Sequence, residues 1–185
     1  MVLYLIAGYA GSGKTEYATM LARRLKAPLV DKDTVTRPLT EALNQAIGIN
    51  AHDRESQKYL ETSRPLEYQC LYQVIDENLA SCPNIIATAP WIKEILDPAW
   101  KDKMKMAAAM DDHQLLIVWM HCDLETMRSR MVMRNADRDY WKLRNWTRYA
   151  DAVDLDTPQA NADYIVDNSN QGEPLFVQLK RMLSQ

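Results

Sequence analysis

The segment GYAGSGKT places Gly8, Gly13, Lys14 and Thr15 at the spacing GxxxxGK[ST]. Glycines let a backbone turn tightly and direct its N–H groups at a phosphate. At this spacing a lysine reaches the outer phosphates of a nucleotide, and a threonine hydroxyl binds Mg²⁺. An apolar run precedes the segment and a helical pattern follows it, which is the context of a phosphate-binding loop. We therefore predict a site for the phosphates of ATP or GTP, formed by Gly8, Gly11, Ser12, Gly13, Lys14 and Thr15.

Two carboxylates follow the next apolar run, in the segment DKDT. In an open parallel sheet, ligands bind beyond the carboxyl ends of the strands, so Asp31 and Asp33 are expected near the phosphate-binding loop. Transfer of a phosphoryl group to a hydroxyl uses a base for the hydroxyl proton and a metal ion for the phosphates. Both acids are candidates for the substrate site, with Arg37 four residues beyond Asp33, and Asp31 is also a candidate metal ligand with Thr15. The alternative is a solvated turn.

Residues 128–148 are rich in arginine. Arg130 and Arg134 are four residues apart, so a helix would present them on one face, and Arg138 follows in a polar loop beside Asp139. Guanidinium groups bind phosphate oxygens in pairs. We predict that this segment is a lid over the nucleotide that also excludes water. A solvated helix face is the alternative.

A third charged cluster lies between the second and third predicted strands, where an acceptor site could form. It comprises Asp53, Arg54, Glu55 and Arg64. The segment TAPW places Thr88 and Trp91 near the same mouth, although Trp91 could equally be part of the core. Many enzymes with this kind of loop carry an aspartate at the end of the third strand, and here Thr88 stands in that region. The acids of DKDT, or water molecules, would then hold the metal.

Apolar strands alternate with helical patterns along the whole chain. The predicted strands are 2–7, 28–30, 85–89, 115–120 and 164–166, and the predicted helices are 14–26, 38–47, 65–80, one beginning after Asp123, and 173–183. Strands without polar alternation are buried on both faces, which indicates a parallel sheet between two helical layers. We expect one α/β domain over 1–185, a three-layer P-loop fold with a five-stranded parallel sheet and a helical lid at 128–148.

Composition narrows the classes of function. The chain has 185 residues and a formal net charge of −3, so no overall positive field attracts nucleic acid or an anionic membrane. No apolar run is long enough to span a bilayer. The cysteines Cys70, Cys82 and Cys122 form no CxxC pair, which fits small buried side chains in a reducing compartment. We expect a cytoplasmic protein; the sequence does not specify its oligomeric state.

Together these motifs resemble the small P-loop kinases grouped with AAA-family ATPases, which are related to shikimate, gluconate and polynucleotide kinases and to chloramphenicol phosphotransferase. The resemblance rests on GYAGSGKT, LVDKDTVTRPLTEAL, DRESQKYLETSRPLEY, IIATAPW and WMHCDLETMRSRMVMRNADRDYWKL. It implies that Asp33 takes the proton of the acceptor, with Asp31 as the reserve. It also implies that Arg130, Arg134 and Arg138 are the lid arginines, and that the loop 167–174 holds adenine.

Three functions remain open at this point. The first is a phosphotransferase that uses ATP and Mg²⁺ and phosphorylates a hydroxyl of a small molecule. The second is a 5′-hydroxyl kinase of nucleic acid, which the net charge disfavours. The third is a nucleotide-dependent ATPase or switch with a protein partner, which needs no acceptor base. Aromatic residues of the lid region could stack a substrate ring or belong to the core: Tyr140, Trp141, Trp146 and Tyr149.

Overall fold

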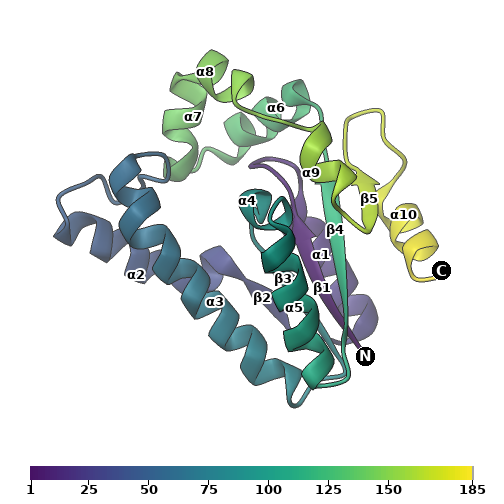
Figure 1. Cartoon of the computed structure of the whole chain (residues 1–185). Coiled ribbons are helices and arrows are strands. Elements are labelled where there is room, and N and C mark those ends of the chain that lie inside the picture. Colours follow the sequence, from purple (N-terminus) through teal and green to yellow (C-terminus); the bar gives the residue numbers. More distant parts are fainter. Residues whose placement is uncertain (185) are drawn as a thin grey trace.

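The computed structural model describes residues 1–184. A five-stranded sheet in the order β2-β3-β1-β4-β5 forms the centre, and all its pairings are parallel. Its strands are β1 (Val2–Ala7), β2 (Leu29–Asp31), β3 (Asn84–Thr88), β4 (Gln114–His121) and β5 (Tyr164–Asp167). The predicted fold class, a parallel sheet flanked by helices, is confirmed (Figure 1).

Helices connect successive strands and cover both faces of the sheet (Figure 1). The helices are α1 (Lys14–Leu25), α2 (Lys32–Ala46), α3 (Arg64–Leu79), α4 (Ile92–Ile95), α5 (Pro98–Met110), α6 (Leu124–Arg134), α7 (Tyr140–Arg144), α8 (Trp146–Asp151), α9 (Asp156–Ala160) and α10 (Leu175–Met182). A π-helical turn, η1 (Tyr59–Ser63), leads into α3, and a 3₁₀ turn, η2 (Asp137–Asp139), lies between α6 and α7.

The sheet separates two apolar cores because successive side chains of a strand point to opposite faces. Leu3 and Leu5 of β1 pack on one face with α3 and α5. Tyr4 and Ile6 of the same strand pack on the other face with α1 and α10. This two-sided burial explains why the charged, amide and hydroxyl side chains of the strands, tyrosines apart, stand only at strand ends.

The strand order determines where ligands can bind. β1 is central, and it pairs with β3 on one side and β4 on the other. The chain therefore runs in opposite directions across the sheet from β1, and this reversal opens a crevice at the carboxyl ends of the strands. The loop after β1 and the acids after β2 both begin at that edge of the sheet, where Asp31 is in register with Thr88.

Several local predictions are wrong. The helix expected from residue 38 begins at Lys32, because the Asp31 side chain accepts a hydrogen bond from Thr34 N and caps it, and Pro38 lies inside α2. The helices α4 and α5 were not predicted from the sequence. Trp91 is fully buried and belongs to the core. Cys122 is buried as expected, whereas Cys70 and Cys82 are only half-buried.

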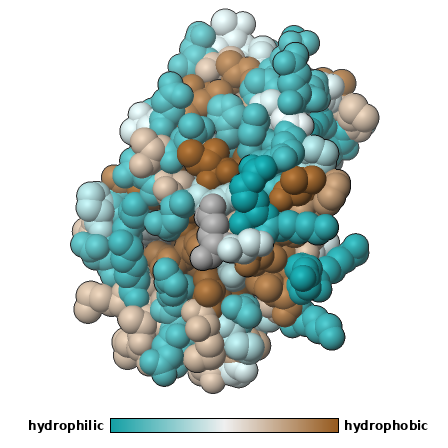
Figure 2. All heavy atoms as spheres, turned by 90° about the vertical axis from the view of Figure 1, so that its right-hand side faces the viewer, coloured by the Kyte–Doolittle hydropathy of each residue, from teal (hydrophilic) through white to brown (hydrophobic). Residues whose placement is uncertain are grey.

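The outer surface beside β5 and α10 is mainly polar. Figure 2 shows this side, where brown apolar groups are separated by hydrophilic ones. Ile165 and Phe176 are the large apolar side chains of β5 and α10 with substantial exposure. Within residues 1–184, no helix combines the length and the apolar character that crossing a membrane requires.

Candidate active site

The loop between β1 and α1 is shaped for a phosphate. Gly11 and Gly13 have φ angles of +83° and +87°, in the left-handed region that side chains disfavour. A Cβ atom at Gly13 would lie 2.0 Å from Nδ2 of Asn168, so a larger residue there would displace the Asn168 side chain from its hydrogen bond with Ser12 O. α1 begins directly after Gly13. The backbone N–H groups of its first turn and its positive dipole end therefore face the loop, which favours an anion.

Lys14 lies folded over this loop. Its Nζ donates a hydrogen bond to the backbone oxygen of Tyr9 at 2.7 Å. Burial lowers the pKa of the Lys14 ammonium to about 8, and the nearby cation of Arg134 acts in the same direction while Asp33 opposes it. A negatively charged group beside Lys14 would stabilise the protonated form of its side chain. The side chain thus fits a polyphosphate.

Asp31 joins the loop to the second strand. Its Oδ2 accepts a hydrogen bond from Thr15 Oγ1 at 3.2 Å, and its Oδ1 accepts from Thr34 N at 3.0 Å. The Thr15 hydroxyl and the Asp31 carboxylate therefore present adjacent oxygen atoms beside the predicted phosphate site. A magnesium ion bound to a nucleotide needs only one or two such protein oxygens, because phosphates and water supply the others. No cluster of three or more acidic, histidine or cysteine ligands occurs within residues 1–184.

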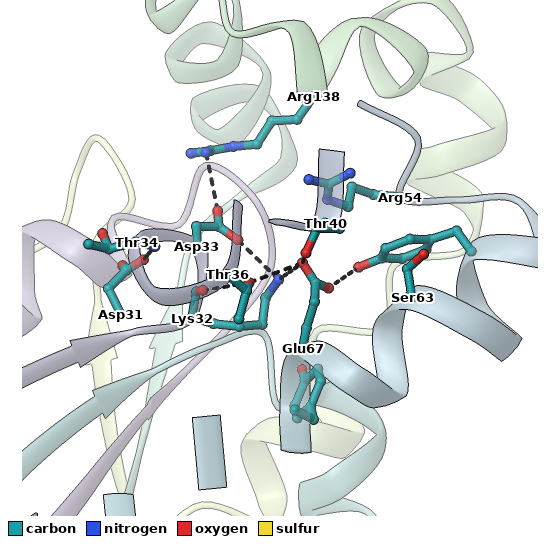
Figure 3. Close-up of polar contacts among 12 residues, drawn as sticks. Asp31, Lys32, Asp33, Thr34, Thr36, Thr40, Arg54, Ser63, Glu67 and Arg138 are labelled. Atoms are coloured by element: carbon teal, nitrogen blue, oxygen red, sulfur yellow. Dashed lines mark hydrogen bonds and ion pairs between the residues drawn. The ribbon is translucent and has the colours of Figure 1, made fainter. Parts of the chain in front are cut away.

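Asp33 faces the cavity with its carboxylate between two cations (Figure 3). Lys32 Nζ lies 3.0 Å from Oδ1, and Arg138 Nη1 lies 3.2 Å from Oδ2. Burial by itself raises the pKa of Asp33, but the charges of Lys32 and Arg138 outweigh it and hold this pKa well below its usual range. Asp33 is therefore an ionised hydrogen-bond acceptor at neutral pH.

A cavity of about 440 Å³ extends from the phosphate-binding loop to the lid. Its walls come from five parts of the chain that are far apart in the sequence. Lining residues include Lys14 and Thr15, Asp31 and Asp33, Arg54 with Tyr59 and Arg64, Thr88, and Arg134 with Arg138, Lys142 and Tyr149. The structure thus brings the predicted loop, acid pair and two of the predicted lid arginines to one space.

Ion pairs link the lid segment to the rest of the cavity wall. Arg138 contacts Asp33, and Lys142 of α7 forms an ion pair with Glu55. Arg134 instead stays within the lid, where its Nε and Nη2 donate to Oδ2 of the buried Asp139 at 2.8 and 2.5 Å. Such a fork fixes the guanidinium plane of Arg134 at the cavity edge.

The wall opposite the lid carries two stacked arginines. The Arg64 guanidinium lies 4.2 Å from the ring centroid of Tyr68, and its Nη2 donates to Glu94 Oε1 at 2.6 Å. Arg54 lies 5.4 Å from the ring centroid of Tyr59. Stacking on an aromatic ring holds a guanidinium in place and shields one of its faces from water. This wall is therefore cationic and aromatic at once.

Five predicted site residues are absent from the cavity lining: Gly8 and Ser12 of the phosphate-binding loop, and Arg37, Asp53 and Arg130. Arg37 is exposed on α2. Asp53 accepts hydrogen bonds from the backbone N–H groups of Glu55 and Ser56 and so shapes its own turn. Arg130 donates to Gly11 O and to Asn168 Oδ1, which places it against the back of the phosphate-binding loop. Arg130 and Arg134 share a helix but contact different parts of the site.

Sequence reasoning missed a buried polar network next to Asp33. Glu67 of α3 is 2% exposed, and Lys32 is 5% exposed. Glu67 lies four residues before Leu71 and eight before Ile75, so it stands on the buried face of its helix. An acid on the apolar stripe of a helix is the signal that would have found it.

Three solved structures with the same fold carry names of kinases. A gluconokinase from Sinorhizobium meliloti is 18% identical, with a TM-score of 0.58 over 99% of this chain and 94% of that one. A shikimate kinase from Bacteroides thetaiotaomicron is 16% identical, with a TM-score of 0.56 over 99% and 96%. A sugar kinase from a Janibacter species is 15% identical, with a TM-score of 0.56 over 100% and 93%. At these identities the likeness establishes the fold.

No curated protein matches the sequence significantly. The family model described as an AAA domain matches residues 3–155, a span that contains the phosphate-binding loop, the acid pair and the lid. The match agrees with the resemblance read from the sequence motifs. The chain belongs to the AAA-domain family.

Proposed function

We propose that the protein is a kinase that transfers the γ-phosphoryl group of ATP to a hydroxyl of a small molecule. The observation that carries this proposal is the position of Asp33, an ionised carboxylate that shares one cavity with Lys14 of the phosphate-binding loop. A protein that only hydrolyses or senses ATP has no need of an acceptor base there. The kinase names of the three similar structures support the same class of reaction.

The residues present fit ATP and Mg²⁺. Backbone N–H groups after Gly11 and Gly13, together with Lys14, would hold the phosphates, and Thr15 with Asp31 would hold the metal ion. Bound Mg²⁺ supplies positive charge to the phosphate oxygens. Arg134 and Arg138 from the lid would neutralise further charge on the moving phosphoryl group.

In the proposed reaction, the acceptor oxygen forms a bond to the γ-phosphorus while the bond from this phosphorus to the β–γ bridging oxygen breaks. The acceptor proton moves to Asp33, and the products are ADP and a phosphate ester. The low pKa of Asp33 makes it a weak base. A weak base suffices because in a loose phosphoryl-transfer transition state the attacking oxygen carries little positive charge until late. The main contribution of Asp33 is then the orientation of the hydroxyl.

The size of the cavity favours a small acceptor. About 440 Å³ must take part of the nucleotide as well as the acceptor, and small-molecule sites in proteins start near about 300 Å³. The net charge of −3 disfavours a nucleic-acid acceptor. We therefore expect an acceptor the size of a sugar, a sugar acid or a nucleoside.

Release of ADP from Mg·ATP tests the proposal. The purified protein is incubated alone and with nucleosides, sugars, aminoglycosides, gluconate and shikimate, the last two because two similar structures are named for them. Acceptor-dependent release should fall about 10²-fold or more in Asp33→Asn, because one carboxylate oxygen becomes an NH2 group and the amide cannot take the hydroxyl proton, and affinity for ATP should stay within about twofold. Asp102→Asn, an exposed acid on α5, is the matched control. Release that ignores every acceptor and is unchanged by Asp33→Asn would indicate an ATPase or a switch.

A further inference from the structure

A buried carboxylate lies beneath Asp33 and collects four polar contacts (Figure 3). Glu67 Oε1 lies 3.1 Å from Lys32 Nζ, 3.0 Å from Thr40 Oγ1 and 3.3 Å from Thr36 Oγ1, and its Oε2 accepts from the Tyr59 hydroxyl at 2.5 Å. The Thr36 hydroxyl has one proton, and the backbone oxygen of Lys32 at 2.8 Å is the nearer acceptor. Lys32, Thr40 and Tyr59 are therefore the principal partners of Glu67.

Lys32 bridges this buried carboxylate to Asp33. Its Nζ lies 3.1 Å from Glu67 and 3.0 Å from Asp33 Oδ1. Adjacent residues of a helix point in different directions and do not normally face each other. Helix geometry alone therefore does not bring the Lys32 ammonium to Asp33. The ion pair with Glu67 of the neighbouring helix α3 holds the ammonium in this position.

A contribution to stability alone does not account for this network of Lys32, Asp33 and Glu67. Removing two charges from water has a cost that their attraction only partly offsets, and apolar residues of the same volume are often at least as stable. The three groups also carry one negative charge in excess, because a single ammonium faces two carboxylates. Arg138 balances that charge from the lid side of the cavity. The surplus charge lies on Asp33, the member of the network that the cavity exposes.

We propose that Lys32 and Glu67 are positioning residues for Asp33: Glu67 anchors Lys32, and Lys32 holds Oδ1, so that Oδ2 is the oxygen that meets the acceptor hydroxyl. The two oxygens differ in what holds them. Oδ1 is bound to a side chain that is 7% exposed, whereas Oδ2 pairs with Arg138, which is 26% exposed and belongs to the lid. An entering acceptor displaces the more exposed partner, Arg138, and leaves the buried one, Lys32, in place. This inference rests on the proposed kinase function.

The π-helical turn before α3 is part of the same arrangement. Tyr59 is its first residue, and Ser63 at its end donates to Asn44 Oδ1 of α2 at 2.6 Å. Turns of this type occur often at functional sites, because they shift a side chain that a regular helix would point elsewhere. Here the turn brings the Tyr59 hydroxyl to Glu67.

The first test changes the network and measures turnover. Lys32→Met should lower kcat about 10- to 100-fold, because an acceptor base that is no longer oriented loses much of its contribution, while the KM for Mg·ATP changes less than about twofold. Lys32→Arg should recover part of the loss. Tyr72→Phe, on the same helix as Glu67, removes a hydrogen bond from Trp100 that lies outside the cavity lining and outside the network, so it should leave kcat unchanged.

A double-mutant cycle separates positioning from general structural damage. If Lys32 acts through Asp33, Lys32→Met should cause no further loss in the Asp33→Asn background. An equal loss in both backgrounds would overturn the inference. A loss in Asp33→Asn with full activity in Lys32→Met would also overturn it and leave the kinase proposal intact. Unchanged activity in Asp33→Asn would instead remove the kinase proposal.

A crystal structure of the variant gives a result that does not depend on the acceptor. Lys32→Met alone leaves Glu67 buried without its ammonium, so the protein to crystallise is Lys32→Met with Glu67→Gln, in which both charges are gone. We expect its Asp33 carboxylate to leave the orientation seen here. An Asp33 carboxylate that keeps the wild-type orientation would show that Lys32 does not position it.

Discussion

Two carboxylates only two positions apart have separate surroundings because a helix begins between them. Asp31 ends β2 and caps α2, so both of its oxygens are engaged by Thr15 and Thr34. Asp33 stands in the first turn of the helix and turns its carboxylate to the cavity. The cap thus directs one acid to the phosphate-binding loop and the other to the part of the cavity where we propose that the acceptor binds. One local feature, an aspartate at an N-cap, gives the two acids different surroundings.

Lys14 should make nucleotide binding depend on pH. Its pKa of about 8 in the unbound protein should rise when phosphates lie beside it, so the protonated form binds better. The affinity for Mg·ATP is then nearly constant below pH 8 and falls by up to about tenfold per pH unit above it. Calorimetry in two buffers of different ionisation enthalpy should show proton uptake on binding at pH 9 and little at pH 7.

The control for this pH dependence is Lys14→Met, which should bind weakly and equally at both pH values. Equal affinity of the wild-type protein at pH 7 and pH 9 would contradict the prediction.

Among single residues, the sequence predicts those whose chemistry is tied to a motif. Lys14, Thr15 and Asp33 all line the cavity. Arg37 follows Asp33 in the sequence, but the early start of α2 turns it to solvent. The place of Glu67 on the apolar stripe of α3 indicates that it is buried, but spacing within one helix does not reveal its contact with Lys32 of α2.

Among the elements, the lid depends on contacts made across the cavity. η2 and α7 carry Arg138 and Lys142, and these reach Asp33 and Glu55 on the opposite wall. The sequence located the arginine-rich segment, since Arg134 and Arg138 both line the cavity. The sequence also placed Arg138 in a polar loop after the helix, and the structure has the break there: Asn135 ends α6 in the left-handed conformation, and the 3₁₀ turn η2 carries Arg138.

Arg138→Gln should loosen the lid in the protein without nucleotide. Partly exposed ion pairs contribute about 0–1 kcal/mol, so opening should become up to about fivefold more frequent. Hydrogen exchange of the backbone amides in residues 137–144 measures this change. Arg144→Gln is the matched control, because Arg144 bonds only Tyr140 within the lid. Exchange that rises equally in both variants would mean that the pair with Asp33 does not hold the lid.

Sequence patterns predict the strands but miss the start of α2 and the π-helical turn. The five strands were predicted because each is a short apolar run between polar segments. The helix predicted from residue 38 begins six residues earlier, because the cap at Asp31 starts it and α2 accommodates Pro38. The π-helical turn was not predicted, since its extra residue per turn depends on the contacts of Tyr59 and Ser63 with other helices.

Across the whole molecule, parallel strands gather charge at one edge of the sheet. The loop after β1, the acids after β2 and the lid after β4 converge there, and cations face one another as a result. Arg134 and Arg138 both act to lower the pKa of Lys14, which is a measure of their mutual repulsion. A polyphosphate would relieve this repulsion. The apolar cores on the two faces of the sheet are thus packed, whereas Lys14 and the two lid arginines still repel one another at the cavity.

Binding of Mg·ATP should consequently stabilise the entire domain. At a ligand concentration of about 100 times Kd, mass action adds about 2.7 kcal/mol, which raises Tm by about 5–10 °C for a domain of this size. Because the cavity is built from segments throughout residues 9–153, we expect one cooperative transition that moves as a unit, in keeping with the prediction of a single domain that includes its lid. Differential scanning calorimetry measures both quantities. Adenosine, which has no phosphates, should produce little shift, and Lys14→Met should lose most of the shift with Mg·ATP. Two transitions, of which only one responds to Mg·ATP, would mean that the lid or another part of the chain folds independently of the phosphate-binding loop.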